Sequence, residues 1–118
     1  MIKPSPAGIF ADCCPEPMNA AQAVDLAAAF KALADPVRLR IASIVACCPA
    51  GEVCVGEIAS EFSVSGPTIS HHLKKLREAG VLSCERRASE VYYQVRSDRL
   101  DALIGQLTAM RPAAGRTP

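Results

Sequence analysis

The spacing of apolar residues in the first half of the chain predicts two consecutive helices. An alanine-rich run follows Asn19, a residue type that often caps helices, and continues to Ala34. The pattern restarts over residues 35–48, with Asp35 as N-cap and Pro36 at the first helical position. The apolar stripes expected on these helices are Val24, Ala27, Phe30 and Leu33, then Val37, Ile41, Ile44, Val45 and Cys48.

Two further helices, one short and one long, are predicted after a break at Pro49 and Gly51. The short helix covers residues 52–62. The long helix follows Ser65 as N-cap and stops at Gly80, where glycine can adopt the left-handed conformation. Its expected apolar stripe is Ile69, His72, Leu73 and Leu76. We expect His72 to be a core histidine, and the other face is polar and basic.

Residues 81–96 change from helical to alternating periodicity, which predicts a β-hairpin. The apolar positions of the alternation are Leu82, Cys84, Val91, Tyr93 and Val95. Since Cys84 shares a phase with Leu82, we expect it in the core. The tip segment, RRASE, lacks a glycine, so the type of turn is open.

A last helix completes an order of elements that defines a fold class. Ser97 or Asp98 is expected to cap it, and its stripe is Leu100, Leu103, Ile104, Leu107 and Met110. The order helix, helix, short helix, helix, hairpin, helix is typical of a winged helix-turn-helix, which is mainly α with a β-hairpin wing. This domain is predicted over residues 19–110, between an extended arm (1–18) and a flexible tail (111–118).

Composition narrows the class of protein. The chain has 118 residues, 50% of them hydrophobic and 21% charged, so one folded domain is expected. A core of this size favours a homodimer joined through an apolar helix face. No stretch approaches the roughly 20 apolar residues of a membrane span, and no secretory signal precedes Cys13. We therefore expect a cytoplasmic protein with free thiols and no membrane partner.

Charge is divided unevenly between the two halves of the chain. Residues 1–62 carry four basic and seven acidic side chains, a balance of −3. Residues 63–118 carry nine basic and five acidic side chains, a balance of +4. The basic half contains the predicted long helix and hairpin, which is where a surface for an anionic polymer would lie.

The polar face of the long helix has the residue types of a DNA recognition helix. Short hydroxyls and a histidine near its start suit base edges in the major groove, and later cations suit phosphates. The predicted base readers are Thr68, Ser70 and His71. The predicted backbone contacts are Lys74, Lys75 and Arg77, with Arg86 and Arg87 at the wing. Solvation is the alternative role of these charges, and the correct order of helices and wing favours double-stranded DNA.

Four segments resemble, in the same order, the ArsR/SmtB family of metalloregulatory repressors. They are KALADPVRLRIASIV, GEIASEF, SGPTISHHLKKLREAGVL and YYQV. The resemblance implies a homodimer joined through its first and last helices, which binds operator DNA without metal and releases it when a metal or metalloid binds. Such a protein is not an enzyme. Gly66 stands where many members have Gln, so one base contact of the family is missing here.

Six cysteines are the soft ligands of the chain, at positions 13, 14, 47, 48, 54 and 84. Both histidines lie on the predicted recognition helix, and the last helix lacks the His that zinc sensors of the family place there. Thiolates favour thiophilic ions such as As(III), Sb(III), Cd(II), Pb(II) and Cu(I). Three thiols match As(III), whereas four better suit tetrahedral zinc or cadmium.

Cys54 is the most informative of these thiols. It stands at the N-cap of the short helix, with Glu57 three residues later as in a capping box, where Ser or Thr would cap better. We expect the helix N-terminus to lower the pKa of this thiol. The alternative role of Cys54 is that of a small apolar residue. Many arsenic-sensing relatives carry Cys-Val-Cys here, and this chain has Gly56 at the third position.

The resemblance extends to a branch of the family in which an N-terminal cysteine pair and a cysteine of the third helix bind As(III). It implies Cys13, Cys14 and Cys54 as ligands, the pair from one protomer and the single thiol from the other, with As(III) or Sb(III) as inducer. A rival site combines Cys47, Cys48 and Cys54, and a vicinal disulfide is a further alternative.

Three other functions are alternatives to an arsenite-responsive repressor. A Cd(II)- or Pb(II)-responsive repressor and a thiol redox-sensing repressor would use the same fold. A thiol enzyme or a metal-sequestering protein is disfavoured, because no anion-binding loop surrounds a cysteine and sequestration needs no recognition helix.

Overall fold

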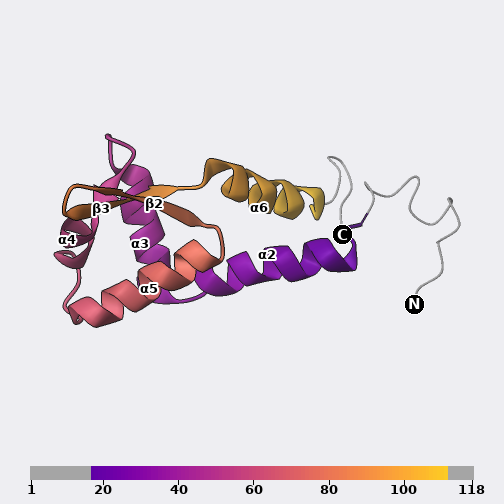
Figure 1. The fold of residues 1–118 in the computed structure, drawn as a ribbon. Coiled ribbons are helices and arrows are strands. Elements are labelled where there is room, and N and C mark those ends of the chain that lie inside the picture. The colour runs from indigo at the N-terminus through magenta and orange to yellow at the C-terminus, as the bar shows by residue number, and fades with distance from the viewer. Residues whose placement is uncertain (1–16, 112–118) are drawn as a thin grey trace, which may run out of the picture.

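The computed structural model describes residues 17–111 and has the predicted architecture, mainly α with a β-hairpin wing (Figure 1). The arm and the tail fall largely outside these residues. The elements are α2 (Ala20–Leu33), α3 (Pro36–Cys47), β1 (Val53–Cys54), α4 (Val55–Ala59), α5 (Gly66–Glu78), β2 (Leu82–Arg87), β3 (Glu90–Val95) and α6 (Ser97–Ala109). No helix in the described part of the chain is long and apolar enough to cross a membrane.

Three helices begin at the predicted caps. The Asn19 side chain accepts from the backbone N–H of Gln22 at 2.8 Å, and the Gln22 side chain accepts from the Asn19 N–H at 2.9 Å. Asp35 caps α3 with Pro36 in its first turn, and Ser65 caps α5. Local sequence therefore fixes where the helix-turn-helix elements begin.

The last helix begins one residue earlier than predicted. Its N-cap is Arg96, which makes no side-chain cap, and Ser97 and Asp98 lie inside the first turn. Asp98 instead accepts from the guanidinium of Arg96 at 2.8 Å. An acidic side chain in the first turn also suits the positive end of the helix dipole.

The first part of the predicted short helix is a strand. Val53 and Cys54 form β1, which pairs antiparallel with β3 in the register Val53↔Tyr93 and Cys54↔Tyr92. The sheet therefore has three strands in the order β1-β3-β2. Two residues carry no periodicity, so only the distant partner strand specifies this element.

One core joins α3, α4, α5 and the base of the hairpin. Side chains on α3 and α5 bury as their stripes predict, because residues three and four apart share one helix face. The fully buried large side chains are Ile41, Val45, Ile58, Ile69, Leu73, Leu76, Val81 and Leu82. The recognition helix is thus seated on a core formed within one chain.

The stripes of α2 and α6 are largely exposed in the single chain, in contrast to α5. On α2 the buried residues are Leu26, Ala29 and Ala32, whereas the predicted stripe is exposed except at Leu33, which packs against the core, and Val24 is 74% exposed. On α6 only Leu103 is buried. The two helices extend together away from the core (Figure 1), and Arg99 of α6 contacts Asp25 of α2 at 2.6 Å.

The hairpin closes with a two-residue turn between Arg87 and Glu90. Ala88 has φ of 55°, in the region that normally favours glycine. A positive φ at the first turn residue alone is typical of a type II′ turn. The tip lacks glycine but still makes a tight wing.

Cys84 is exposed, which corrects its predicted place in the core. It lies on the same face of β2 as Leu82, which is only 1% exposed. The strand runs outward from the core toward the wing tip, so the core covers Leu82 and not Cys84.

Candidate nucleic-acid interface and thiol site

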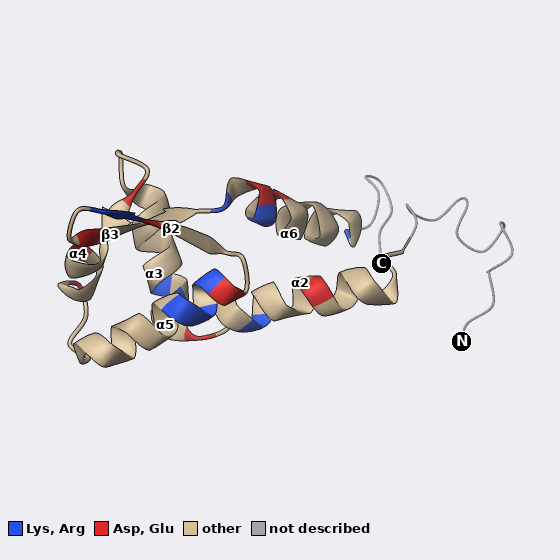
Figure 2. Cartoon of the chain, viewed as in Figure 1, with Lys and Arg blue, Asp and Glu red and all other residues tan. Residues whose placement is uncertain are grey.

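The recognition helix α5 divides cleanly into a buried and an exposed face. Ile69, Leu73 and Leu76 are buried. The predicted contact residues are all exposed: Thr68, Ser70, His71, Lys74, Lys75 and Arg77. Figure 2 shows basic residues on the second half of α5 and on the hairpin. The helix can therefore present hydroxyls and His71 ahead of a group of cations.

His72 holds the recognition helix against α3, as its place on the stripe predicted. Its Nδ1 accepts from Nε of Arg38 at 3.1 Å and lies 3.9 Å from Asp35 Oδ2. The backbone N–H of Arg38 makes the largest contribution to lowering the pKa of Asp35. Asp35 is thus the cap of α3 and part of the joint that orients α5.

The start of α5 has open space around Gly66. A Cβ built on Gly66 meets nothing within 4 Å. Thr68 shares a hydrogen bond of 2.8 Å with the hydroxyl of the cap residue Ser65. The first turn therefore offers two adjacent hydroxyls, and no side chain at position 66.

The two wing arginines differ in their surroundings. Arg86 is exposed, and no ion pair of Arg86 occurs among residues 17–111. Arg87 binds Glu52 with both guanidinium NH groups, and Nη2 lies 2.8 Å from Glu52 Oε1 and 2.9 Å from Glu85 Oε1. Its guanidinium also stacks 4.9 Å from the ring centre of Tyr92.

Glu52 is a functional candidate that sequence analysis missed. The hydrogen bond from Arg87 is the main cause that lowers the pKa of its carboxyl group. The side chain also accepts from Gln94 Nε2 at 3.1 Å. Glu52 directly precedes β1, so it ties the wing to the segment that contains Cys54.

Cys54 lies at the junction of β1 and α4 and is half-buried. Its backbone N–H donates to Glu57 Oε1 at 3.2 Å, which is half of the predicted capping box. Through β1 the residue pairs with Tyr92 of the wing strand β3. Cys54 is thus the thiol that connects the helix-turn-helix with the wing.

The expected lowering of the Cys54 pKa is wrong. The backbone N–H of Glu57 is the largest single influence and lowers the pKa of the thiol. Burial and the carboxylates of Glu90 and Glu57 outweigh it, so the pKa lies above its ordinary value. Cys54 is therefore a neutral thiol at neutral pH.

A cavity of about 440 Å³ opens beside this thiol, between the start of α4 and the hairpin turn. Its lining residues are Val55, Gly56, Ser89, Glu90 and Val91. Gly56 contributes no side chain to this cavity, and a Cβ built on it meets nothing within 4 Å.

Within residues 17–111, the other cysteines do not assemble a site around Cys54. Cys47 is exposed, as is Cys84, and Cys48 is half-buried against the core. Within residues 17–111, no three His, Cys, Asp or Glu side chains are grouped as metal ligands. The rival site of Cys47, Cys48 and Cys54 is therefore not preformed. Cys13 and Cys14 lie outside the described residues.

A basic recognition helix seated on a helical core and flanked by a hairpin defines a winged helix-turn-helix DNA-binding regulator. Residues 35–83 match the family model described as "Bacterial regulatory protein, arsR family". The chain is 35% identical over 96 residues to the biofilm growth-associated repressor of Agrobacterium fabrum, covering 81% of this chain and 80% of the relative. The chain belongs to the ArsR family.

Two further comparisons bear on ligand and assembly. The arsenic resistance transcriptional regulator ArsR1 of Pseudomonas putida is 44% identical over 66 residues, which cover 56% of this chain and 50% of that protein. A homodimeric winged helix-turn-helix DNA-binding domain from Mycobacterium bovis superposes with a TM-score of 0.62 at 29% identity, covering 76% of this chain and 82% of that domain. The protein is a DNA-binding transcriptional repressor of this family, not an enzyme.

Proposed function

We propose that the protein is an arsenite-responsive repressor that uses Cys13, Cys14 and Cys54 as ligands. The apo homodimer binds double-stranded operator DNA, and As(III), or Sb(III) with the same chemistry, releases it. The main support is the position of Cys54, a half-buried thiol on the strand that pairs with the wing. The similarity to an arsenic resistance regulator supports a metalloid as the inducer.

The chemistry of arsenite suits a neutral thiol. In water As(III) is arsenous acid, As(OH)₃, and three thiols replace its three hydroxyls: As(OH)₃ + 3 RSH → As(SR)₃ + 3 H₂O. No proton is released and nothing is oxidised. A divalent cation instead displaces one proton from each thiol that it binds. The raised pKa of Cys54 therefore penalises Cd(II) or Pb(II) and leaves As(III) unaffected.

The remaining two ligands come, in this proposal, from the N-terminal arm of the partner protomer. Cys47 is exposed and Cys48 packs on the core, so neither is grouped with Cys54. The cavity beside Cys54 provides room for a segment that carries two adjacent thiols. As(III) would then join one protomer to the other.

A few direct contacts connect Cys54 to the DNA-binding surface. β1 pairs with β3, and Glu52 holds Arg87 of the wing through two hydrogen bonds. A shift of β1 on ion binding would move the wing relative to α5. A coupling of about 1 to 3 kcal/mol between two sites lowers DNA affinity roughly 5- to 150-fold.

The DNA-contacting residues follow from exposure and chemistry. Thr68, Ser70 and His71 would read base edges, and the cations that follow would bind phosphates. These cations are Lys74, Lys75, Arg77 and Arg86. Arg87 would contact DNA only after leaving Glu52, so in the apo state its main role is to position the wing.

The dimer interface is proposed on α2 and α6. Their exposed apolar side chains include Val24, Ile104, Leu107 and Met110, from 50% to 74% exposed in the single chain. Large apolar side chains gathered on two adjacent helices are typical of a surface that is buried in a dimer.

A DNA-binding titration tests the proposal. Wild-type protein should bind its promoter fragment and lose affinity 5- to 150-fold, to the order of magnitude expected for allosteric coupling, when arsenite is added. Cys13→Ser should bind DNA equally well and ignore arsenite. Cys84→Ser, at an exposed thiol outside the site, is the matched control and should respond normally.

Each alternative gives a different result in the same titration. Unchanged DNA affinity with arsenite would contradict the proposal. Release by Cd(II) alone would make the protein a divalent-metal sensor. Release by peroxide in metal-free buffer, reversed by a reductant, would make it a redox sensor.

A further inference from the structure

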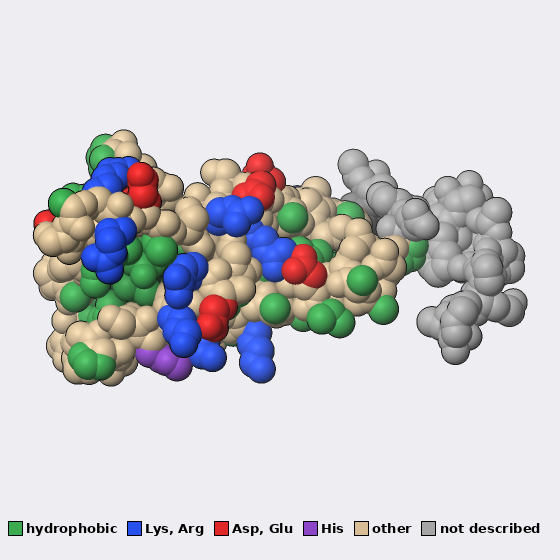
Figure 3. Space-filling view, viewed as in Figure 1, with side chains coloured by type: hydrophobic (Ala, Val, Ile, Leu, Met, Phe, Trp, Pro, Cys, Tyr) green, Lys and Arg blue, Asp and Glu red, His purple; other side chains and the backbone are tan. Residues whose placement is uncertain are grey.

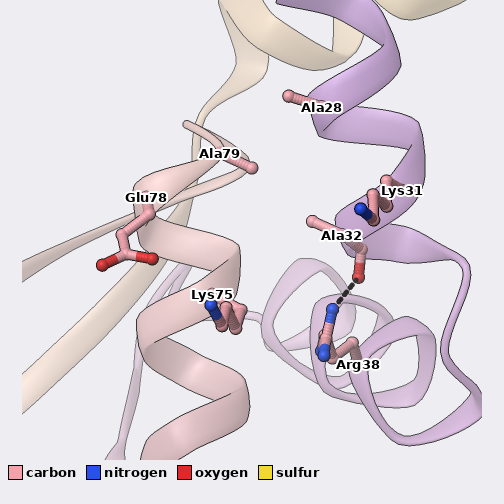
Figure 4. Close-up of a pocket in the computed structure, with 7 residues that line it drawn as sticks. All are labelled: Ala28, Lys31, Ala32, Arg38, Lys75, Glu78 and Ala79. Carbon is pink, nitrogen blue, oxygen red and sulfur yellow. Dashed lines mark hydrogen bonds between the residues drawn. The ribbon is translucent and has the colours of Figure 1, made fainter.

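A second hollow lies between the recognition helix and α2, away from Cys54. It has a volume of about 350 Å³ and opens where α2, α3 and α5 meet (Figure 4). Its lining residues are Ala28, Lys31, Ala32, Arg38, Lys75, Glu78 and Ala79. Three of its side chains are basic and one is acidic, so its chemistry favours an anion.

The cations of this hollow are available to a ligand. No ion pair of Lys31 or Lys75 occurs within residues 17–111, and both side chains are exposed. Figure 4 shows the carboxylate of Glu78 pointing away from the gap between α5 and α2. The positive charge of Lys31 and Lys75 is therefore not neutralised within this part of the chain.

Arg38 supplies a fixed third charge. It is half-buried, its Nε donates to His72 Nδ1 at 3.1 Å, and one of its NH groups donates to the carbonyl of Ala32 at 3.5 Å. These bonds hold the guanidinium in place beside the hollow. The alanines Ala28, Ala32 and Ala79 leave space between the helices because their side chains are small.

The hollow adjoins the DNA-facing surface of α5. Lys75 follows His71 by four residues, so the two side chains are neighbours on the exposed face, about one turn apart. Figure 3 shows a histidine and a row of Lys and Arg side chains along one edge of the molecule, from α5 toward α2. A duplex that places its major groove at His71 would bring a flanking phosphate toward Lys75 and Lys31.

We propose that this hollow binds a backbone phosphate of operator DNA, with Lys31 and Lys75 as contacts and Arg38 as a fixed positive charge. The inference rests on the proposed DNA binding and adds residues of α2 and α3 to a surface otherwise made of α5 and the wing. Such a contact carries no base specificity, but it would set how the recognition helix is oriented on the duplex.

The salt dependence of DNA binding tests the site with Lys31→Gln, a change on an exposed side chain of α2. One lost phosphate contact makes the negative slope of log K against log salt shallower by about 0.9, which is about 5-fold in affinity at 0.15 M salt. Operator and unrelated DNA should weaken equally. Lys31→Arg should restore the wild-type slope.

Arg96→Gln is the matched control, because it also removes one positive charge. Arg96 is exposed, and it pairs with Asp98 outside the hollow. Its slope should stay at the wild-type value. An unchanged slope in Lys31→Gln, or an equal loss in both variants, would overturn the proposed phosphate site.

Free phosphate is the other source of the same ligand chemistry. Inorganic phosphate is titrated by calorimetry against wild type and Lys31→Gln at constant ionic strength. Binding that Lys31→Gln abolishes while its DNA slope stays unchanged would replace the DNA contact by a free-anion site and overturn the proposal.

Arsenite release separates this proposal from the proposed function. Lys31→Gln should still be released from DNA by arsenite with the wild-type fold-change. A normal arsenite response with an unchanged salt slope would overturn the phosphate site alone. Failure of the wild type to bind DNA at all would overturn both proposals.

Discussion

The recognition helix and the thiol segment before α4 differ in how far one chain completes them. In α5 the cap, the buried face and the anchor His72 are all present within one protomer, and the contact residues are exposed. At the thiol segment, Cys54 is the one proposed ligand within residues 17–111, and it lies beside an open cavity. A DNA-binding surface can form within one chain, whereas the inducer site that we propose at Cys54 needs ligands from another part of the protein.

This difference has a functional consequence. A preformed recognition helix pays little ordering cost when it meets DNA, so the apo state is competent to bind. A site that must recruit a second segment couples ion binding to a change of structure. A repressor that its ligand releases needs both a preformed DNA-binding surface and a ligand site whose completion changes the structure.

Truncating the core under α5 should produce the largest effect, a loss of stability in the domain that holds the recognition helix. Leu73 is 1% exposed, so Leu73→Ala should lower the free energy of unfolding by about 2 to 5 kcal/mol. Urea denaturation measures this. Lys74→Ala, on the exposed face of the same helix, should change stability by less than about 0.5 kcal/mol. Equal losses would show that α5 is not seated on the core as described.

The pH dependence of inducer binding tests whether Cys54 reacts as a neutral thiol. Burial and nearby carboxylates raise the pKa of the Cys54 thiol, so it is protonated below that pKa. Arsenite replaces hydroxyls by thiols without releasing protons, and its apparent affinity should stay nearly constant between pH 6.5 and 8. Cd(II) affinity should rise up to about tenfold per bound thiol for each pH unit. A steep rise for arsenite would contradict the neutral-thiol account.

Mixed dimers test whether the site is completed by the partner. One protomer carries Cys13→Ser with Cys14→Ser, and the other carries Cys54→Ser. A site that crosses between protomers leaves one intact three-thiol set in this dimer, so arsenite should still weaken DNA binding. A site within one protomer leaves none. Each double or single variant as its own homodimer should be unresponsive and serves as the control.

Breaking the ion pair between Glu52, beside the thiol segment, and Arg87 of the wing should have the smallest effect. Glu52→Gln removes the ion pair with Arg87, whose side chain is 44% exposed, and an exposed ion pair contributes little to stability. The fold-change that arsenite produces in DNA affinity should shrink by up to about 5-fold. Asp98→Asn breaks a similar exposed pair with Arg96 at the start of α6 and should leave the fold-change intact. An equal arsenite-induced fold-change in the two variants would show that Glu52 does not couple the thiol segment to the wing.

Local signals in the sequence were sufficient for the helix-turn-helix. The caps at Asn19, Asp35 and Ser65 and the stop at Gly80 depend on residues within one turn, and the structure confirms them. The alternation that predicts the hairpin is equally local. Helical spacing alone predicts His72 as a core residue; the structure places it at the edge of the core, half-buried and bonded to Arg38.

Contacts between distant residues could not be predicted in the same way. β1 exists because Cys54 pairs with Tyr92, and Arg87 binds Glu52 across 35 positions. The pKa of the Cys54 thiol is raised first by burial and then by the carboxylates of Glu90, on the wing, and Glu57. Periodicity likewise identified the apolar stripes of α2 and α6, but it does not state whether a stripe packs within the chain or against a partner.

The stoichiometry of arsenite binding, followed by the absorption of arsenic-thiolate bonds, tests the proposed three-thiol site. We expect two As(III) ions per dimer, each bound by three thiols, with the absorption change lost in Cys13→Ser and in Cys54→Ser and retained in Cys84→Ser. Binding that persists without Cys54, or that is lost with Cys47 or Cys48 instead of the N-terminal pair, would contradict it.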